Sequence, residues 1–174
     1  MAANSAPARG AGAGTEDGVF WGWLDGYLNG IIGIAILGSQ ITFTVLVSEI
    51  ADPAAVLQPA TPAFGRETVR AFIGVSWLLF IASLGISSFT KVVLSDPHER
   101  AWLIARMGVR RFRSLYSVLT LVLDALSVVP FLFLALATTA YLPVIGWIGT
   151  AFVSLFSLVV AVSWFLLDWR ASLV

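Results

Sequence analysis

Four long apolar runs dominate the chain, and most polar residues fall between them. The runs extend from Leu28 to Ile50, Ala71 to Leu94, Leu115 to Thr139 and Leu142 to Leu167. A helix that crosses a bilayer needs about 20 apolar residues, because it rises about 1.5 Å per residue across a core of about 30 Å. The runs lack apolar and polar alternation and exceed the length of barrel strands, which have about 10 residues. The pattern predicts an all-α integral membrane protein with a four-transmembrane-helix bundle.

The segments outside these runs suggest a tail and a structured loop. Residues 1–18 are rich in Ala, Gly, Ser and Pro without a hydrophobic period, which predicts a disordered cytosolic tail before a membrane domain over residues 19–174. Pro143 separates the third and fourth runs, so we expect a tight helical hairpin there. In the basic loop 95–114, Asp96 suits an N-cap and Pro97 the first helical position. We expect a helix from Pro97 along the membrane surface, with continuation into the third span as an open alternative.

The distribution of Lys and Arg predicts the orientation. Six basic residues lie at the end of the second run or between it and the third run. The loop between the first two runs holds only two, Arg66 and Arg70. By the positive-inside rule, the segment with more basic residues is cytosolic, and four spans then place both termini in the cytosol as well. Which membrane holds the protein does not follow from the sequence. The six are Lys91, Arg100, Arg106, Arg110, Arg111 and Arg113.

Composition narrows the function classes. Of the 174 residues, 59% are hydrophobic and 11% are charged, and the formal net charge is zero, so no overall electrostatic attraction to nucleic acid is predicted. The chain has no cysteine, which excludes disulfides and thiolate sites. Phosphate-binding loops, zinc-protease motifs and hydrolase nucleophile motifs are also missing. We therefore predict a protein that is not an enzyme and that has no cofactor or metal site.

One acidic residue, Asp124, lies well inside a predicted span. A carboxyl group in hydrocarbon costs a few kcal/mol, so it should face the bundle interior or water. Two interpretations stay open: an interhelical hydrogen bond that fixes packing, or a step in a cation or proton path with Gln40 and nearby hydroxyls as polar partners. Pro130 follows in the same run and predicts a kink.

Two further surfaces are candidates for contacts outside the bundle. Small residues recur at intervals of three to five positions, and such surfaces let helices approach closely within one bundle or between protomers. The basic cluster contains candidate contacts to anionic lipid head groups, although topology alone also explains it. The small residues include Gly30, Gly33, Gly38, Ser83, Ser87 and Gly146, and the candidate head-group contacts are Arg106, Arg110, Arg111 and Arg113.

Part of the chain resembles a known membrane domain. The stretch from Ile34 to Leu46, the following Pro- and Gly-containing loop, and the start of the second run with Ser76 and Ser83 resemble the PGG domain. The resemblance covers about half of the chain and implies four spans and a regulatory or interaction role, with no catalytic residues. The sequence departs from that family in having no Pro-Gly-Gly in the loop and no ankyrin repeats.

Two functions follow from these observations. The first, which we prefer, is a small interaction or regulatory membrane protein that packs against itself or another membrane protein. The second is a subunit of an oligomeric channel or transporter in which Asp124 and Gln40 face a water path. In both, the lipid bilayer is the first partner and nucleic acid is not one.

Overall fold

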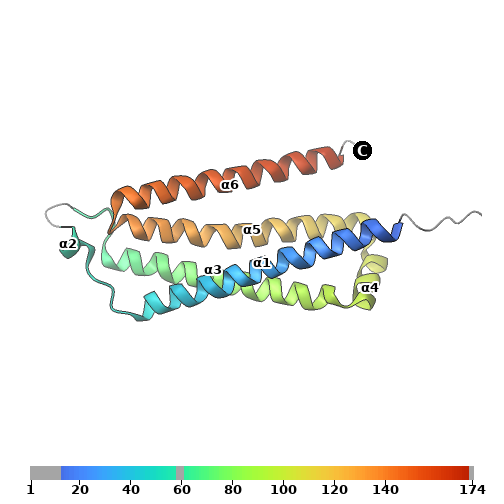
Figure 1. Cartoon of the computed structure of the whole chain (residues 1–174), viewed down its shortest axis with the longest axis horizontal. Coiled ribbons are helices and arrows are strands. Elements are labelled where there is room, and N and C mark those ends of the chain that lie inside the picture. The colour runs from blue at the N-terminus through green and yellow to red at the C-terminus, as the bar shows by residue number, and fades with distance from the viewer. Residues whose placement is uncertain (1–12, 58–60, 173–174) are drawn as a thin grey trace, which may run out of the picture.

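The computed structural model describes the backbone of residues 13–57 and 61–172, and the side chains of residues 20–57, 61–108, 111–112 and 114–162. Four long helices run up and down beside one another (Figure 1). Each contains a stretch long and apolar enough to cross a membrane. The predicted all-α four-span membrane architecture is confirmed. The helices are α1 (Ala13–Val47), α3 (Arg66–Ser95), α5 (Val109–Thr139) and α6 (Pro143–Ser172).

Two short helices mark the two ends of the bundle. Helix α2 (Pro53–Val56) lies between α1 and α3, and α4 (Pro97–Met107) lies between α3 and α5, so we name the ends the α2 end and the α4 end (Figure 1). Helix α4 begins as predicted, because the Asp96 carboxylate accepts the backbone N–H of His98 at 2.8 Å. It does not continue into the third span. Gly108, at φ 78°, adopts a conformation that favours glycine and separates α4 from α5.

The first helix is longer than the apolar run that predicted it. Its candidate span is Phe20–Val47, whereas the predicted span began at Leu28. The added turns belong to the membrane domain because Leu24 is buried against the other helices. Residues 13–18 of the predicted disordered tail are helical, and residues 1–12 lie outside the described residues.

Helix α3 is the centre of the arrangement, with α1 packed on one side and α5 on another. Its buried residues are spaced alternately four and three positions apart, which keeps them on one seam that faces neighbouring helices. Several of them are small and hydroxylated, and such residues let helix backbones approach closely in a membrane. The buried residues are Val69, Ile73, Ser76, Phe80, Ser83, Ser87 and Thr90.

The matching face of α1 follows the same spacing. Leu24, Leu28, Ile31 and Ala35 are buried, and Gly38 continues the series. A Cβ atom at Gly38 would lie 2.5 Å from the Phe80 ring, so the glycine gives the ring of α3 its place against α1. These residues use one face of α1 and leave the opposite face outside the bundle.

Helix α5 carries its proline within this packing. Pro130 is fully buried, and its carbonyl oxygen accepts the Ser76 hydroxyl of α3 at 3.0 Å. One turn earlier, the hydroxyl oxygens of Ser83 and Ser127 lie 3.4 Å apart. The helix continues through the proline without interruption. Pro130 therefore lies at a point where α3 and α5 are joined by polar contacts.

Helices α5 and α6 form the predicted tight hairpin. The turn at Ala140 to Leu142 leads into α6 at Pro143, and Gly146 lies against the backbone of Thr139. Helix α6 packs on α5 at the edge of the bundle (Figure 1). Its apolar side chains point outward over most of its described length, as expected for a span that lipid surrounds.

Replacing Gly146 with Ala should loosen the hairpin, because the new methyl group would overlap the Thr139 backbone, which cannot rotate away. We expect a loss of about 1–3 kcal/mol in the free energy of unfolding, measured by titrating the detergent-solubilised protein with sodium dodecyl sulfate. Gly149→Ala is the matched control, since its Cβ would lie 3.6 Å from that of Ala135, an ordinary contact. Equal stability of the two variants would contradict the close approach.

Candidate functional site

Polar side chains from three helices gather in the α4 half of the bundle. They form two hydrogen-bonded groups, one around Asp124 and one around Lys91. We name them together the polar cluster, which consists of the side chains of Asp25, Tyr27 and Asn29 of α1, Lys91 of α3 and Asp124 of α5, and the backbone carbonyl of Thr120.

The Asp124 group joins α5 to α1. The Tyr27 hydroxyl donates to the Asp124 carboxyl at 2.7 Å and lies 3.3 Å from the carbonyl oxygen of Thr120. Around it, Leu24, Leu28 and Leu123 are buried. A short hydrogen bond in apolar surroundings satisfies one oxygen of the carboxyl group and fixes the rotation of α1 against α5.

A second tyrosine lies close to this group. The Tyr116 hydroxyl, about two turns before Asp124 on α5, is buried and has no hydrogen-bond partner among the described residues. Its ring packs with Phe20 of α1 at a centroid distance of 5.5 Å. Tyr27 and Tyr116 thus pack against the same apolar cluster, but only Tyr27 bonds to Asp124.

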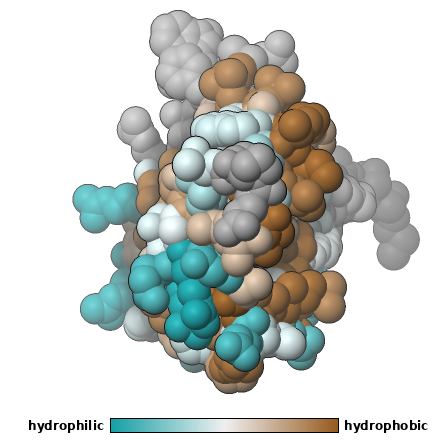
Figure 2. Space-filling model, turned by 90° about the vertical axis from the view of Figure 1, so that its left-hand side faces the viewer, coloured by the Kyte–Doolittle hydropathy of each residue, from teal (hydrophilic) through white to brown (hydrophobic). Residues whose placement is uncertain are grey.

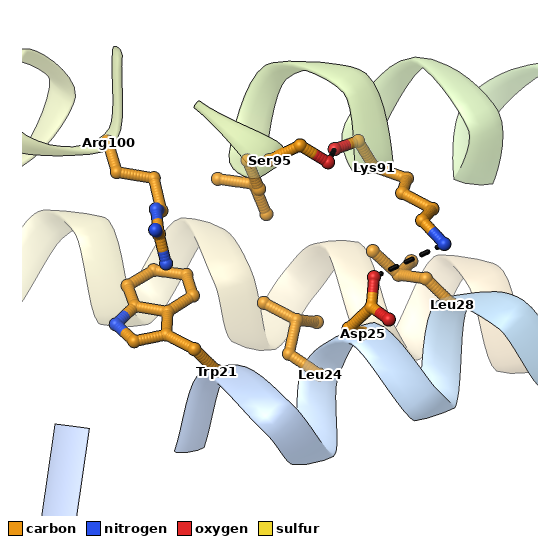
Figure 3. A pocket seen from close by; sticks show the side chains of 8 residues that line it. Trp21, Leu24, Asp25, Leu28, Lys91, Ser95 and Arg100 are labelled. Atoms are coloured by element: carbon orange, nitrogen blue, oxygen red, sulfur yellow. Dashed lines mark hydrogen bonds and ion pairs between the residues drawn. The ribbon is translucent and has the colours of Figure 1, made fainter. Parts of the chain in front are cut away.

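The Lys91 group joins α3 to α1. Lys91 Nζ lies 3.2 Å from Asp25 Oδ1 and donates to the side-chain oxygen of Asn29. Asn29 in turn donates to Asp25 Oδ2 at 3.0 Å, which closes a three-membered set of contacts. Figure 3 shows the Lys91 side chain reaching from α3 to Asp25. The side chains are 32% and 57% exposed for Lys91 and Asp25, so the pair faces the bundle surface.

Gln40, predicted as a polar partner of Asp124, lies elsewhere. It is exposed on the outside of α1 and stands 13 residues beyond Tyr27, a rise of about 20 Å at about 1.5 Å per residue. The structure therefore does not bring Gln40 to Asp124. The sequence pattern does not indicate which face of α1 meets α5, so it could not distinguish Gln40 from Tyr27 as the partner of Asp124.

The hydroxyl groups near Gln40 do not extend the cluster either. Ser39 donates to the Ile36 carbonyl, Thr42 to that of Gly38, and Thr44 to that of Gln40. Each bond lies within α1, as is common for Ser and Thr in helices. Among the described side chains, these hydroxyls form no polar connection from Asp124 to the α2 end.

The candidate head-group contacts are at the α4 end, as their positions in the sequence predicted. Arg106 is exposed on α4, and its guanidinium lies 5.3 Å from the centre of the Trp102 ring. Arg111 is exposed at the start of α5. The side chains of Arg110 and Arg113 lie outside the described residues.

The α2 end has a mixed set of charges. Figure 2 looks onto this end and shows hydrophilic residues gathered beside apolar ones. The Tyr141 hydroxyl donates to the Ala51 carbonyl at 2.8 Å, and burial raises the pKa of Tyr141. The contact joins the α5–α6 turn to the segment after α1. The charged residues near this end are Glu49, Asp52, Arg66, Glu67 and Arg70.

Comparison with known proteins gives no relative: no family model, no curated protein and no solved structure matches the chain. The resemblance to the PGG domain stays a prediction. The chain's own geometry is thus the basis for any functional proposal.

Sequence reasoning missed the Lys91 group and the role of Tyr27. In the sequence, Lys91 contributes only to the predicted orientation, and no role is predicted for Tyr27. Asp25 and Asn29 are four residues apart and thus share a helix face, and this spacing was a usable signal. The predicted span begins at Leu28 and leaves Asp25 outside it, so the sequence gives no reason to place this pair beside Lys91. The structure does so because α1 extends further toward its N-terminus.

Tyr27→Phe should lower the free energy of unfolding by about 0.6 kcal/mol, the average for interhelical hydrogen bonds in a membrane protein, and by no more than about 2 kcal/mol. The variant removes the hydroxyl that Asp124 accepts and leaves the ring in place. Tyr116→Phe is the matched control, because its hydroxyl has no partner among the described residues and its loss should cost less. Both are measured by the same detergent titration. A larger effect at Tyr116 would contradict the assignment.

Proposed function

We propose that this chain is a small membrane interaction protein that assembles with a second copy of itself through the outer face of α1. The observation that carries the proposal is a second seam on α1, opposite the one that packs on α3. Its residues are spaced alternately four and three positions apart and are all exposed. They are Gly26, Gly30, Gly33, Leu37, Gln40 and Thr44.

The spacing supports pairing with another helix. A repeat of four and three positions is the spacing of left-handed helix pairs, and the inner seam of α1 uses the same repeat against α3. A Cβ atom at Gly26, Gly30 or Gly33 would meet nothing within 4 Å, so packing inside this chain does not require glycine there. Small residues on a lipid-facing surface let a partner helix approach closely, and close packing drives association in lipid.

Gln40 supports a second copy as the partner. Its amide is exposed within a candidate span, and Gln, like Asn, hydrogen-bonds across helices in membranes. An amide has both donors and an acceptor, so the same residue of another copy is a matched partner across a two-fold axis. A single polar residue in an otherwise apolar seam also fixes the register of two helices.

The polar cluster supports a structural role for Asp124 over a transport role. Its carboxyl group is bonded to Tyr27 and packed among leucines, and Gln40 faces the other way. The channel subunit remains the alternative, with Asp124 in a polar path. The proposal places the α4 end in the cytosol, because Arg100, Arg106 and Arg111 lie there and the α2 end has more acidic than basic residues.

Gly30→Ile should weaken self-association about tenfold, equivalent to about 1.4 kcal/mol, because a branched side chain holds the two backbones apart. The measurement is resonance energy transfer between donor- and acceptor-labelled protein in lipid vesicles, as a function of the protein-to-lipid ratio. Gly85→Ile is the matched control on α3, since Gly85 is also exposed within a span and a Cβ there meets nothing within 4 Å. Gln40→Leu should weaken association about threefold.

A protein that stays monomeric at every protein-to-lipid ratio would contradict the second copy as partner. Equal weakening by Gly30→Ile and Gly85→Ile would show that the outer face of α1 is not the interface. Neither substitution should disturb the fold of the chain, because a Cβ atom at Gly30 or Gly85 meets nothing within 4 Å.

Asp124→Asn separates the two functions. If the protein acts by assembly, the variant should retain self-association within about twofold of the parent, since the asparagine still accepts from Tyr27. A loss of ion flux in reconstituted vesicles, with assembly retained, would instead support the channel subunit. The two readouts are the energy-transfer assay and a pH- or cation-sensitive dye inside the vesicles.

A further inference from the structure

A cavity of about 230 Å³ opens between α1, α3 and α4 beside the Lys91 group. Figure 3 shows its walls: Trp21, Leu24 and Asp25 on α1, Lys91 and Ser95 on α3, and Arg100 reaching in from α4. The cavity thus combines two cations, one carboxylate and an apolar floor.

Arg100 contributes the unmatched charge. Its guanidinium lies 4.5 Å from the centre of the Trp21 ring, which fixes it over the aromatic face. Its Nε is buried without a hydrogen-bond partner among the described residues, and the described part of the chain provides no carboxylate within ion-pair distance of Arg100. A guanidinium presents donors in a planar fork that suits phosphate and carboxylate oxygens.

Lys91 retains capacity for a further contact. An ammonium group has three N–H donors, and Asp25 and Asn29 accept from two of them. The Ser95 hydroxyl already donates to the Lys91 carbonyl at 2.6 Å. The donors available to a guest are therefore those of Arg100 and the remaining one of Lys91, and the charge of the lining is one positive unit in excess.

The position of the cavity suits a lipid. Lys91 lies four residues before the end of its candidate span, about 6 Å along the helix, and Trp21 lies at the start of another. This is the level at which lipid phosphates and interfacial Trp residues occur. We propose that the cavity binds a phosphate group, held by Arg100 and Lys91 and carried on an anionic lipid head group.

The site differs from the basic surface of Arg106 and Arg111. Both side chains are exposed. Arg106 lies over the Trp102 ring, whereas Arg111 has no such aromatic contact among the described residues and would attract anions chiefly through its charge. Arg100 is half-buried and held by Trp21, so its contribution depends on geometry as well as on charge. This difference makes Arg111 a suitable control for Arg100.

The test measures lipid binding by native mass spectrometry of the full chain in a neutral detergent, with phosphatidylglycerol and phosphatidylcholine as probes. Arg100→Gln should weaken phosphatidylglycerol binding about fivefold, equivalent to about 1 kcal/mol for one interfacial charge. It should weaken phosphatidylcholine binding less, because the choline cation offsets the charge of that lipid's phosphate. Arg111→Gln, which removes the same charge from an exposed position, should change phosphatidylglycerol binding by less than about twofold. Arg100→Lys should restore part of the affinity.

Four outcomes decide the proposal. Selective loss in Arg100→Gln supports it, provided that the melting temperature in phosphatidylcholine is unchanged. Equal loss in Arg100→Gln and Arg111→Gln overturns it in favour of a diffuse basic surface. If inorganic phosphate and glycerol phosphate compete as strongly as phosphatidylglycerol, the phosphate site stands and the lipid source is wrong. If Arg100→Gln unfolds, a partial loss of affinity in Arg100→Lys together with a loss in Trp21→Leu supports the site, and unchanged affinity in both variants overturns it.

Discussion

The close contact between α3 and its two neighbours is the constraint on which the rest of the structure depends. Lipid is as apolar as the helices, so helices in a bilayer gain little from burying leucines and associate through tight packing and hydrogen bonds. The buried hydroxyls of α3, such as Ser76, which bonds to the Pro130 carbonyl, supply both. Gly38 of α1 makes room for Phe80 of the same seam. Because α3 faces α1 on one side and α5 on another, its seam determines which faces of those helices turn outward.

The outward face of α1 is a consequence of this packing. When the inner seam of α1 packs on α3, the residue two positions after each inner-seam residue lies on nearly the opposite side of the helix. These outward residues include Gly26, Gly30, Gly33 and Gln40. Helix α6 differs, since its exposed residues are mostly large and apolar. Such a surface suits lipid, whereas glycines and an amide suit another helix. The proposed assembly face is therefore distinguished from the other lipid-facing surfaces by its composition and not by its exposure alone.

The α4 end combines two further consequences of the same arrangement. Helix α4 leaves the direction of α3 at Asp96, whose backbone is extended, and Gly108 ends α4 before α5 begins. This placement of α4 brings Arg100 over Trp21 of α1. At the same end, the extension of α1 brings Asp25 to Lys91. One cavity is thus lined by an ion pair, Lys91 with Asp25, and by Arg100, which has no carboxylate partner among the described residues. The inference of a phosphate site follows from that imbalance.

The sequence by itself determined the number of spans, the hairpin at Pro143 and the start of α4 at Asp96, because these depend on hydrophobic length and on local capping chemistry. It also identified Asp124 as a residue that needs a partner inside the membrane. It did not identify that partner, and Gln40 was the wrong choice, since the faces that two helices present to each other depend on rotations set by packing across the bundle. The separation of Gly38, which packs inside, from Gly30 and Gly33, which face outward, was likewise decided only by tertiary structure. Glycines at similar spacing look alike in sequence, and only the position of α3 distinguishes them.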